Sequence, residues 1–103
     1  DNPKSCGIVE SNSQKVMIDY QEKPKNVKNN IANAAVYFID KKGLSIISQL
    51  DKPFEFSVDV VPKFVNKINL WQNNIYHRDI GTPESYKSAC EEFSKIYQHY
   101  YRI

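Results

Sequence analysis

The sequence is poor in several features, and each shortage excludes a class of protein. The longest apolar run, at 34–39, is far shorter than the ~20 residues that a membrane-spanning helix needs, and no signal-peptide pattern opens the chain. A cytoplasmic protein with no membrane partner is therefore expected. The two cysteines, Cys6 and Cys90, lie far apart and lack zinc-ligand spacing, so two reduced thiols are favoured over a disulfide.

The sequence also has little excess of positive over negative charge and few glycines. The formal net charge is +2 over 103 residues, with lysines and acidic residues interspersed, so no basic stripe predicts a nucleic-acid partner. Only three glycines occur, and they form neither a Walker-type loop nor a GxGxxG motif. A cradle for nucleotide phosphates is therefore missing from this chain. The remaining composition, 41% hydrophobic and 25% charged, is typical of one globular domain spanning 1–103.

The hydrophobic pattern predicts alternating strands and helices. Five stretches rich in β-branched and aromatic residues are expected to be strands: 6–10, 15–21, 33–40, 68–72 and 75–79. The polar tetrad 11–14 predicts a hairpin between the first two strands. The nearly continuous apolar stretch 33–40 is typical of a central strand covered on both faces. Short helices are expected at about 44–50 and about 58–65, the second with Ser57 as N-cap and Pro62 limiting its regularity.

A C-terminal amphipathic helix is the clearest expected element. Thr82 is a good N-cap residue, and Pro83 suits the first helical position. Apolar residues then recur at steps of three and four: Tyr86, Ala89, Cys90, Phe93, Ile96, Tyr97 and Tyr100. Core packing or an interface explains this aromatic face better than base stacking. The order of elements predicts an α/β fold with a mixed β-sheet and this C-terminal helix.

Polar residues at the ends of two expected strands are candidates for ligand binding. Glu22 and Lys23 follow the second strand; Glu22 can accept hydrogen bonds from sugar hydroxyls, and Lys23 can bind a phosphate. The alternative is an exposed ion pair in a loop. Asn33 opens the expected central strand, and its amide can donate to and accept from a hydroxyl at once. The alternative for Asn33 is a strand-capping role.

Asp79 lies between an expected strand and the C-terminal helix, where Gly81 permits close approach and helix amides favour negative charge. It is a candidate ligand for Mg²⁺, although such an ion also takes waters, substrate phosphates and a second carboxylate. The alternative is a turn aspartate bonded to local amides. His77 and His99 share no metal-ligand spacing with a cysteine, so no zinc site is expected.

Five segments, taken in order, resemble the sugar-1-phosphate nucleotidyltransferase family. They are Cys6-Gly-Ile-Val-Glu10, Glu22-Lys-Pro24, Asn33-Ala-Ala-Val-Tyr37, Phe56-Ser-Val-Asp-Val-Val-Pro62 and Asp79-Ile-Gly-Thr-Pro-Glu-Ser-Tyr86. The resemblance implies the second half of that family's Rossmann-like catalytic domain. The amino-acid sequence of the last segment most resembles the corresponding segment of the mannose-1-phosphate and heptose-1-phosphate guanylyltransferase branch.

The resemblance implies roles for single residues. Gly7 and Asn33 would contact the sugar, Glu22 its hydroxyls and Lys23 its phosphate, while Asp79 would hold the catalytic Mg²⁺. Lys23 and Asp79 would then be the catalytic residues. Glu22, Lys23, Asn33 and Asp79 should converge on one cleft. Ala35 departs from the family, where glycine is usual after Asn-Ala, and its methyl group is expected to narrow the pocket.

The implied reaction transfers a nucleotidyl group from an NTP to a sugar-1-phosphate, giving an NDP-sugar and pyrophosphate. The family's glycine-rich nucleotide loop and first metal-binding aspartate are not in this chain, so it is expected to be inactive alone. Half a sheet leaves an open edge, which predicts a homo-oligomer. The alternative function is a non-catalytic α/β remnant or an assembly module that uses the tyrosine-rich helix.

Overall fold

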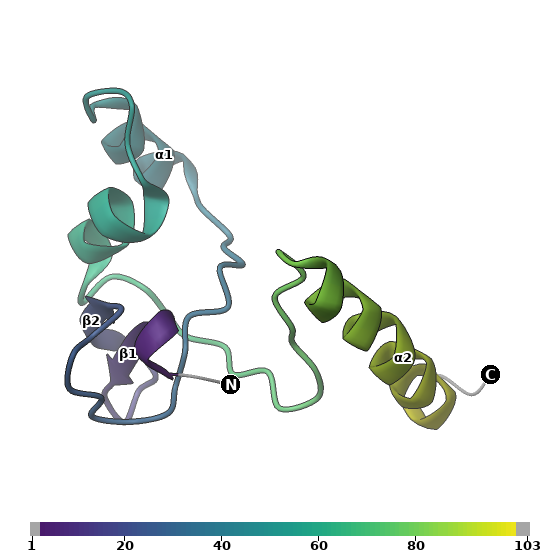
Figure 1. Ribbon diagram of the computed structural model, residues 1–103. Coiled ribbons are helices and arrows are strands. Elements are labelled where there is room, and N and C mark those ends of the chain that lie inside the picture. The colour runs from purple at the N-terminus through teal and green to yellow at the C-terminus, as the bar shows by residue number, and fades with distance from the viewer. Residues whose placement is uncertain (1–2, 101–103) are drawn as a thin grey trace. The chain divides into compact units, whose positions relative to one another are not determined.

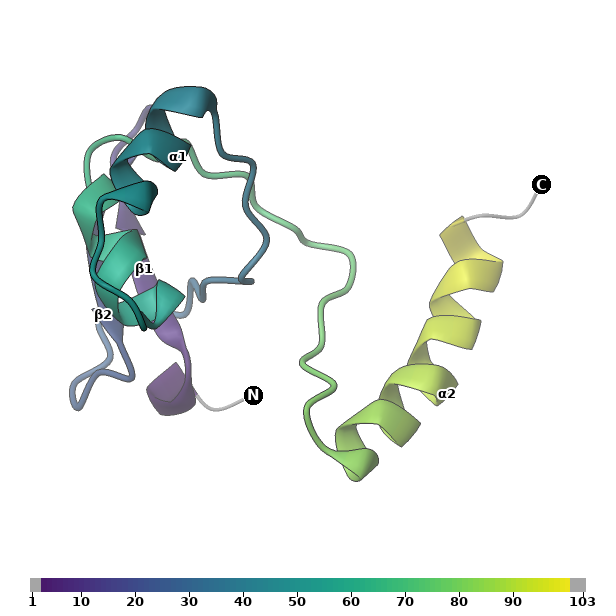
Figure 2. The ribbon, with the colours of Figure 1, turned by 90° about the horizontal axis from the view of Figure 1, so that it is seen from above.

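The structure, a computed structural model, describes residues 3–100 and has the predicted α/β character (Figures 1 and 2). Its residues form two compact units, Asp1–Trp71 and Gln72–Ile103. The first unit holds a β-hairpin with several short helices, and the second holds the C-terminal helix. Within residues 3–100, no helix has both the length and the apolar character that crossing a bilayer requires.

The predicted hairpin is present. Strand β1 (Gly7–Ser11) pairs antiparallel with β2 (Met17–Glu22) to form a two-stranded sheet. The turn forms because the Asn12 side chain accepts hydrogen bonds from the backbone N–H groups of Gln14 and Val16, both at 3.0 Å. An asparagine that satisfies local amides in this way stabilises a tight turn. The register that results decides which residues meet across the hairpin.

The predicted strands 33–40, 68–72 and 75–79 do not form, and the sequence prediction is wrong there. Pairing beside β1 is confined to 31–33, with an isolated bridge between Ile8 and Ala32. The segment 68–72 has one bridge to the hairpin, and 75–79 has none. A strand needs hydrogen-bonded neighbours along its length, and the described residues supply too few. Nor does a second layer cover 33–40, where Phe38 is fully exposed.

The short helices of the first unit also differ from the prediction. Helix α1 (Lys41–Ser48) begins earlier than predicted, because Asp40 accepts a hydrogen bond from the Gly43 N–H at 2.7 Å and caps it. The stretch predicted as one helix at 58–65 is a π-helical turn, η2 (Phe56–Val60), followed by a 3₁₀ turn, η3 (Val61–Phe64).

The break falls beside Pro62, which lacks the N–H that a regular helix would use. The N-cap position of η2 is Glu55 rather than Ser57, and no side-chain hydrogen bond caps that turn. Figure 1 shows η2 and η3 between α1 and the hairpin. A further 3₁₀ turn, η1 (Pro3–Ser5), precedes β1.

A small core holds the first unit together. Four buried side chains form its centre: Val9, Met17, Tyr20 and Val61. Partly buried residues pack around them: Tyr37, Phe56, Val65, Ile68 and Leu70. The core therefore joins one face of the hairpin to the η2–η3 turns, and it includes a tyrosine whose hydroxyl needs a partner.

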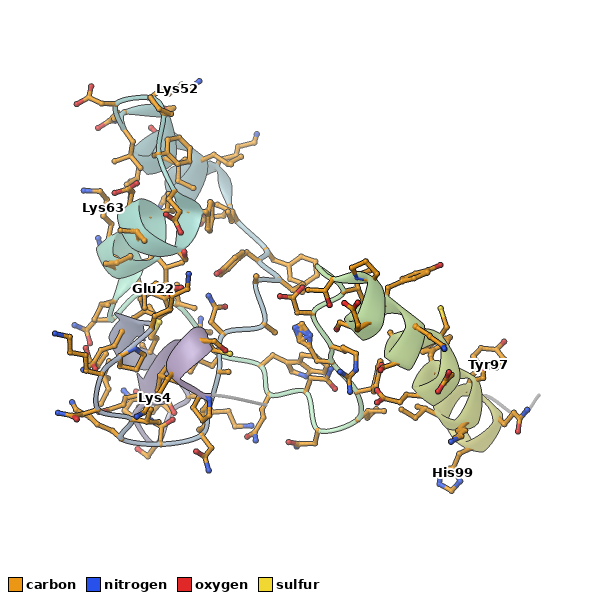
Figure 3. All side chains as sticks on the ribbon, viewed as in Figure 1. Lys4, Glu22, Lys52, Lys63, Tyr97 and His99 are labelled. Atoms are coloured by element: carbon orange, nitrogen blue, oxygen red, sulfur yellow. The ribbon has the colours of Figure 1, made fainter. Side chains whose placement is uncertain are left out.

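The second unit consists of helix α2 (Pro83–Tyr100) and the segment before it. The predicted cap is confirmed, because the Thr82 hydroxyl accepts a hydrogen bond from the Ser85 N–H at 3.1 Å. The aromatic face stays about half exposed: the Phe93 ring touches those of Tyr76 and Tyr97, with centroids 6.5 and 5.9 Å apart. Figure 3 shows Tyr97 and His99 leaving α2 on opposite sides.

The two cysteines lie one in each unit, and neither forms a disulfide, as predicted.

Candidate functional site

Four of the predicted site residues meet at one end of the hairpin. Gly7 lies opposite Glu22 in the strand register. The Lys23 N–H donates to the Cys6 carbonyl at 3.1 Å, and the Asn33 N–H donates to the Gly7 carbonyl at 2.8 Å. Three segments far apart in the sequence are thus tied together by backbone hydrogen bonds. We call the set Gly7, Glu22, Lys23 and Asn33 the hairpin site; Glu22 is labelled in Figure 3.

Two tyrosines that sequence reasoning missed are bonded to the hairpin site. The Tyr20 hydroxyl donates to Glu22 Oε2, and Asn33 Nδ2 donates to the Tyr37 hydroxyl. Asn33 Oδ1 accepts from the Ala35 N–H at 3.0 Å, so the amide also closes a turn. The period-two strand pattern placed Tyr20 two residues before Glu22, on the same face of β2, and this was the available signal.

The environment of Tyr20 keeps its hydroxyl protonated. Burial raises the pKa of Tyr20 well above its ordinary value, and the hydrogen bond to Glu22 raises it further, while the bond from Asn33 opposes the shift. A phenol with a raised pKa remains a donor throughout the physiological range. Tyr20 therefore presents a fixed hydrogen-bond donor to the Glu22 carboxylate.

The Tyr20 ring occupies the space that a side chain at Gly7 would need. A Cβ atom built on Gly7 would lie 2.3 Å from the Tyr20 hydroxyl oxygen and 2.8 Å from two ring carbons. A side chain at Gly7 and the ring of Tyr20 therefore exclude each other. This is a packing reason for glycine that stands beside the predicted sugar contact, which stays a prediction.

The charged residues of the hairpin site do not pair with each other. Among the ion pairs of the described residues, none joins Glu22 to Lys23, so the alternative of a loop ion pair is not realised. Lys23 is exposed, and its backbone φ of 45° is left-handed, which costs an ordinary residue about 1 kcal/mol. Pro24, by contrast, is buried and anchors the loop. Lys23 therefore carries an exposed side chain at the position that follows Glu22.

Ala35 also has left-handed backbone, with φ at 55°. Glycine adopts this conformation without strain, whereas the methyl group of alanine opposes it. The structure thus gives a backbone reason for the glycine that the family resemblance leads one to expect here. The expected narrowing of the pocket by the Ala35 methyl group stays a prediction.

Asp79 stands in the second unit, in the turn before α2. Its Oδ1 accepts from the Gly81 N–H at 2.8 Å, and its backbone carbonyl accepts from the Ser85 hydroxyl. A Cβ on Gly81 would approach Oδ1 to 3.1 Å, so glycine allows the turn. The local-turn interpretation of Asp79 therefore describes its contacts. A shared pocket with Lys23 stays a prediction, because the two residues belong to different units.

As a Mg²⁺ ligand, Asp79 fits in part. Its carboxylate is exposed and offers the hard oxygen that this ion prefers. Within residues 3–100, no three His, Cys, Asp or Glu side chains are grouped so as to share a metal. Mg²⁺ commonly takes only one or two protein carboxylates and completes its shell with waters and substrate phosphates. The donor set thus suits one protein ligand of such an ion, not a complete site.

A second contact that sequence reasoning missed anchors the segment before α2. Arg78 forms a bidentate pair with Glu92, through Nε at 2.8 Å and Nη2 at 2.6 Å. The Tyr76 hydroxyl donates to the same carboxylate at 2.9 Å. These bonds lower the pKa of Glu92, with Arg78 the larger cause. The residue before Asp79 is therefore fastened to the helix.

Comparison with known proteins matches residues 1–95 to the nucleotidyl transferase family model. The chain is 34% identical over 89 residues to the bifunctional protein GlmU of Methanococcus aeolicus, covering 81% of this chain and 21% of that protein. It is 30% identical over 87 residues to GlmU of Methanocaldococcus jannaschii, with 80% and 21% covered. It is 29% identical over 87 residues to the glucose-1-phosphate adenylyltransferase of Fervidobacterium nodosum, with 78% and 21% covered.

The chain spans about a fifth of the length of these curated relatives. No solved structure gave a significant match. None of the three relatives above is named a guanylyltransferase, so that branch stays a prediction. The family match covers nearly the whole chain and every segment that carried the resemblance to sugar-1-phosphate nucleotidyltransferases. The chain therefore belongs to the nucleotidyl transferase family.

Proposed function

We propose that this chain is the sugar-phosphate-binding part of an enzyme that transfers a nucleotidyl group from an NTP to a sugar-1-phosphate. The products are an NDP-sugar and pyrophosphate. The observation that carries the proposal is the hairpin site, in which a carboxylate, an amide and an exposed ammonium are held together by backbone pairing. The relative named as a glucose-1-phosphate adenylyltransferase supports this substrate class.

Each polar group of the hairpin site has capacity left for a ligand. A carboxylate has about four acceptor positions, so Glu22 can accept from sugar hydroxyls while Tyr20 donates to Oε2. The Asn33 side-chain oxygen accepts from the Ala35 N–H and has a second lone pair left for a sugar hydroxyl. The exposed Lys23 ammonium neutralises the phosphate as a point charge. Together these groups orient the sugar and its phosphate.

In the reaction, an oxygen of the sugar-1-phosphate attacks the α-phosphorus of the NTP and displaces pyrophosphate. Lys23 holds the attacking phosphate and offsets its charge, and positioning contributes much of the rate. Asp79 is the residue of this chain that would hold Mg²⁺, which when bound neutralises charge on the transferring group. Since the chain lacks a glycine-rich nucleotide loop, we expect no turnover from the isolated chain.

The finer assignments follow from the same resemblance. The segment from Asp79 to Tyr86 favours a guanylyltransferase acting on a mannose-type or heptose-type sugar phosphate. We further propose a cytoplasmic protein that self-associates, since the apolar side chains of Val36 and Phe38 lie exposed and chains commonly cover such surface by assembly. Light scattering that shows only monomer at high concentration contradicts the self-association.

The test is a titration of the isotope-labelled chain with a panel of sugar-1-phosphates, followed by NMR amide shifts. We expect shifts to gather at the hairpin site and to weaken in Glu22→Gln and Lys23→Ala. The matched control is Lys25→Ala, which removes an exposed lysine two positions away. Binding that is lost equally in the Lys25 variant, or shifts confined to other residues, would refute the proposal.

The second candidate is a non-catalytic assembly module, which the half-exposed aromatic face of α2 favours. The same titration decides between the two. A module of this kind binds no sugar phosphate at the hairpin site, and its shifts appear on α2 when the protein concentration is raised.

A further inference from the structure

We infer that Tyr20 and Tyr37 are positioning residues that orient Glu22 and Asn33 toward the sugar. This inference rests on the proposed function and deepens it, because it names what fixes the two side chains that discriminate sugar hydroxyls. Neither tyrosine is among the residues that the sequence predicted to bind the sugar-phosphate. Each is instead hydrogen-bonded to one of those residues, Tyr20 to Glu22 and Tyr37 to Asn33.

The first step is that both tyrosine rings are anchored. Tyr20 is only 8% exposed and belongs to the core with Val9, Met17 and Val61. The Tyr37 ring packs against that core and against Phe56, with ring centroids 4.8 Å apart. A phenol held by its ring has few rotamers left, so its hydroxyl occupies a fixed point.

The second step is that these fixed hydroxyls hold side chains that would otherwise rotate. Glu22 has three rotatable bonds, and the Tyr20 hydroxyl fixes one carboxylate oxygen, Oε2. Its other oxygen then points in a defined direction. The Tyr37 hydroxyl fixes the amide of Asn33 in the same way, on the side that the turn to Ala35 does not hold. Restricting rotamers before binding reduces the entropy lost on binding.

The third step is that the two tyrosine-bonded pairs lie next to each other in the first unit. The Asn33 side chain lies near enough to the Tyr20 hydroxyl to oppose the rise in the pKa of Tyr20. Glu22 with Tyr20 on β2, and Asn33 with Tyr37 in the loop that follows, thus form two neighbouring hydrogen-bonded pairs. Hydrogen-bonded groups order one another, so removing either hydroxyl frees the binding residue that is bonded to it. No hydrogen bond between side chains joins Lys23, the proposed phosphate ligand, to these described pairs.

The test compares the affinities of the full chain for a sugar-1-phosphate and for inorganic phosphate, by calorimetry or NMR titration. Glucose-1-phosphate and mannose-1-phosphate are the probes. We expect Tyr20→Phe and Tyr37→Phe each to weaken sugar-phosphate binding about tenfold, which is the loss of roughly one oriented hydrogen bond. Inorganic phosphate binding is expected to stay within twofold, because Lys23 is untouched. A purely structural role would move both affinities together.

The matched control is Tyr76→Phe, which removes a tyrosine hydroxyl that also donates to a glutamate, but in the second unit. It should leave the preference for sugar-phosphate unchanged. In the Glu22→Gln background, Tyr20→Phe should cost much less than in the wild type, since the two act through one contact.

The outcomes separate the inference from the proposed function. If Glu22→Gln leaves the preference for sugar-phosphate intact, the proposed function itself fails. If Glu22→Gln abolishes that preference while both tyrosine variants keep it, the inference alone is overturned. Equal loss of both ligands in the tyrosine variants, with melting seen by circular dichroism, also overturns it, because it shows a role in folding alone.

Discussion

The substitution Gly7→Ala tests the contact around which the hairpin site is built. The new methyl carbon would lie 2.3 Å from the Tyr20 hydroxyl oxygen and 2.8 Å from two ring carbons, which no relaxed structure tolerates. The ring has little room to move, because Tyr20 is buried among Val9, Met17 and Val61. Either the ring leaves the core or the two strands separate.

The expected cost follows from three contributions. Overpacking a core costs about 1–3 kcal/mol, and loss of the bond from Tyr20 to Glu22 adds about 1 kcal/mol. The lower entropy of alanine in the unfolded chain offsets about 0.5–1 kcal/mol, since Gly7 has no left-handed backbone to strain. We therefore expect Gly7→Ala to lower the free energy of unfolding by about 2 kcal/mol.

The assay is urea unfolding followed by circular dichroism, with Tyr20→Leu as the partner in a double-mutant cycle. In the Tyr20→Leu background, Gly7→Ala should cost less than about 1 kcal/mol, because the rigid ring is gone. Gly81→Ala is the control, since its Cβ would meet only the flexible Asp79 carboxylate, at 3.1 Å. An unfolding free energy within about 0.5 kcal/mol of wild type, or additive losses in the double variant, would refute the reasoning.

Three further substitutions report on single features of the chain. Ala35→Gly should raise the free energy of unfolding by about 0.5–1 kcal/mol in urea melts by relieving a left-handed φ of 55°; a decrease contradicts the strain. Thr82→Ala should lose about 1 kcal/mol and fray α2 in circular dichroism, whereas Thr82→Ser should not; equal behaviour of the two contradicts the cap. The Gln21 amide donates to Asp19 and is the largest cause of its lowered pKa. The stability that this carboxylate contributes is present above about pH 4 and lost as the pH falls through its folded pKa, so Gln21→Leu should flatten acid unfolding curves there; unchanged curves argue against it.

Local signals in the sequence determined the hairpin and the last helix. Asn12 closes the turn with its own side chain, and Thr82 with Pro83 starts α2, so both depend on residues within a few positions of each other. The family was also readable, because its motifs are short segments whose order survives in a single chain. Of the site, the sequence supplied the residues Gly7, Glu22, Lys23, Asn33 and Asp79, but their roles stay predictions.

The tertiary structure decided everything that depends on a partner distant in the sequence. An apolar stretch such as 33–40 is strand-like by pattern, yet a strand forms only where hydrogen-bonding neighbours lie alongside it, and the described residues provide them at 31–33 alone. The pair of Arg78 with Glu92 likewise joins positions that no helical or strand period relates.

The Tyr20 contact shows the physical reason most directly. The sequence shows a tyrosine two residues before a glutamate, which is compatible with either face of a strand. Only the register, which sets Gly7 opposite Glu22, brings the ring over the glycine and its hydroxyl to the carboxylate. A shift by one residue would turn the ring to the other face, because side chains alternate along a strand. Composition and the alternating pattern do not give that register by themselves, because it depends on the geometry of the turn together with the packing of the buried face.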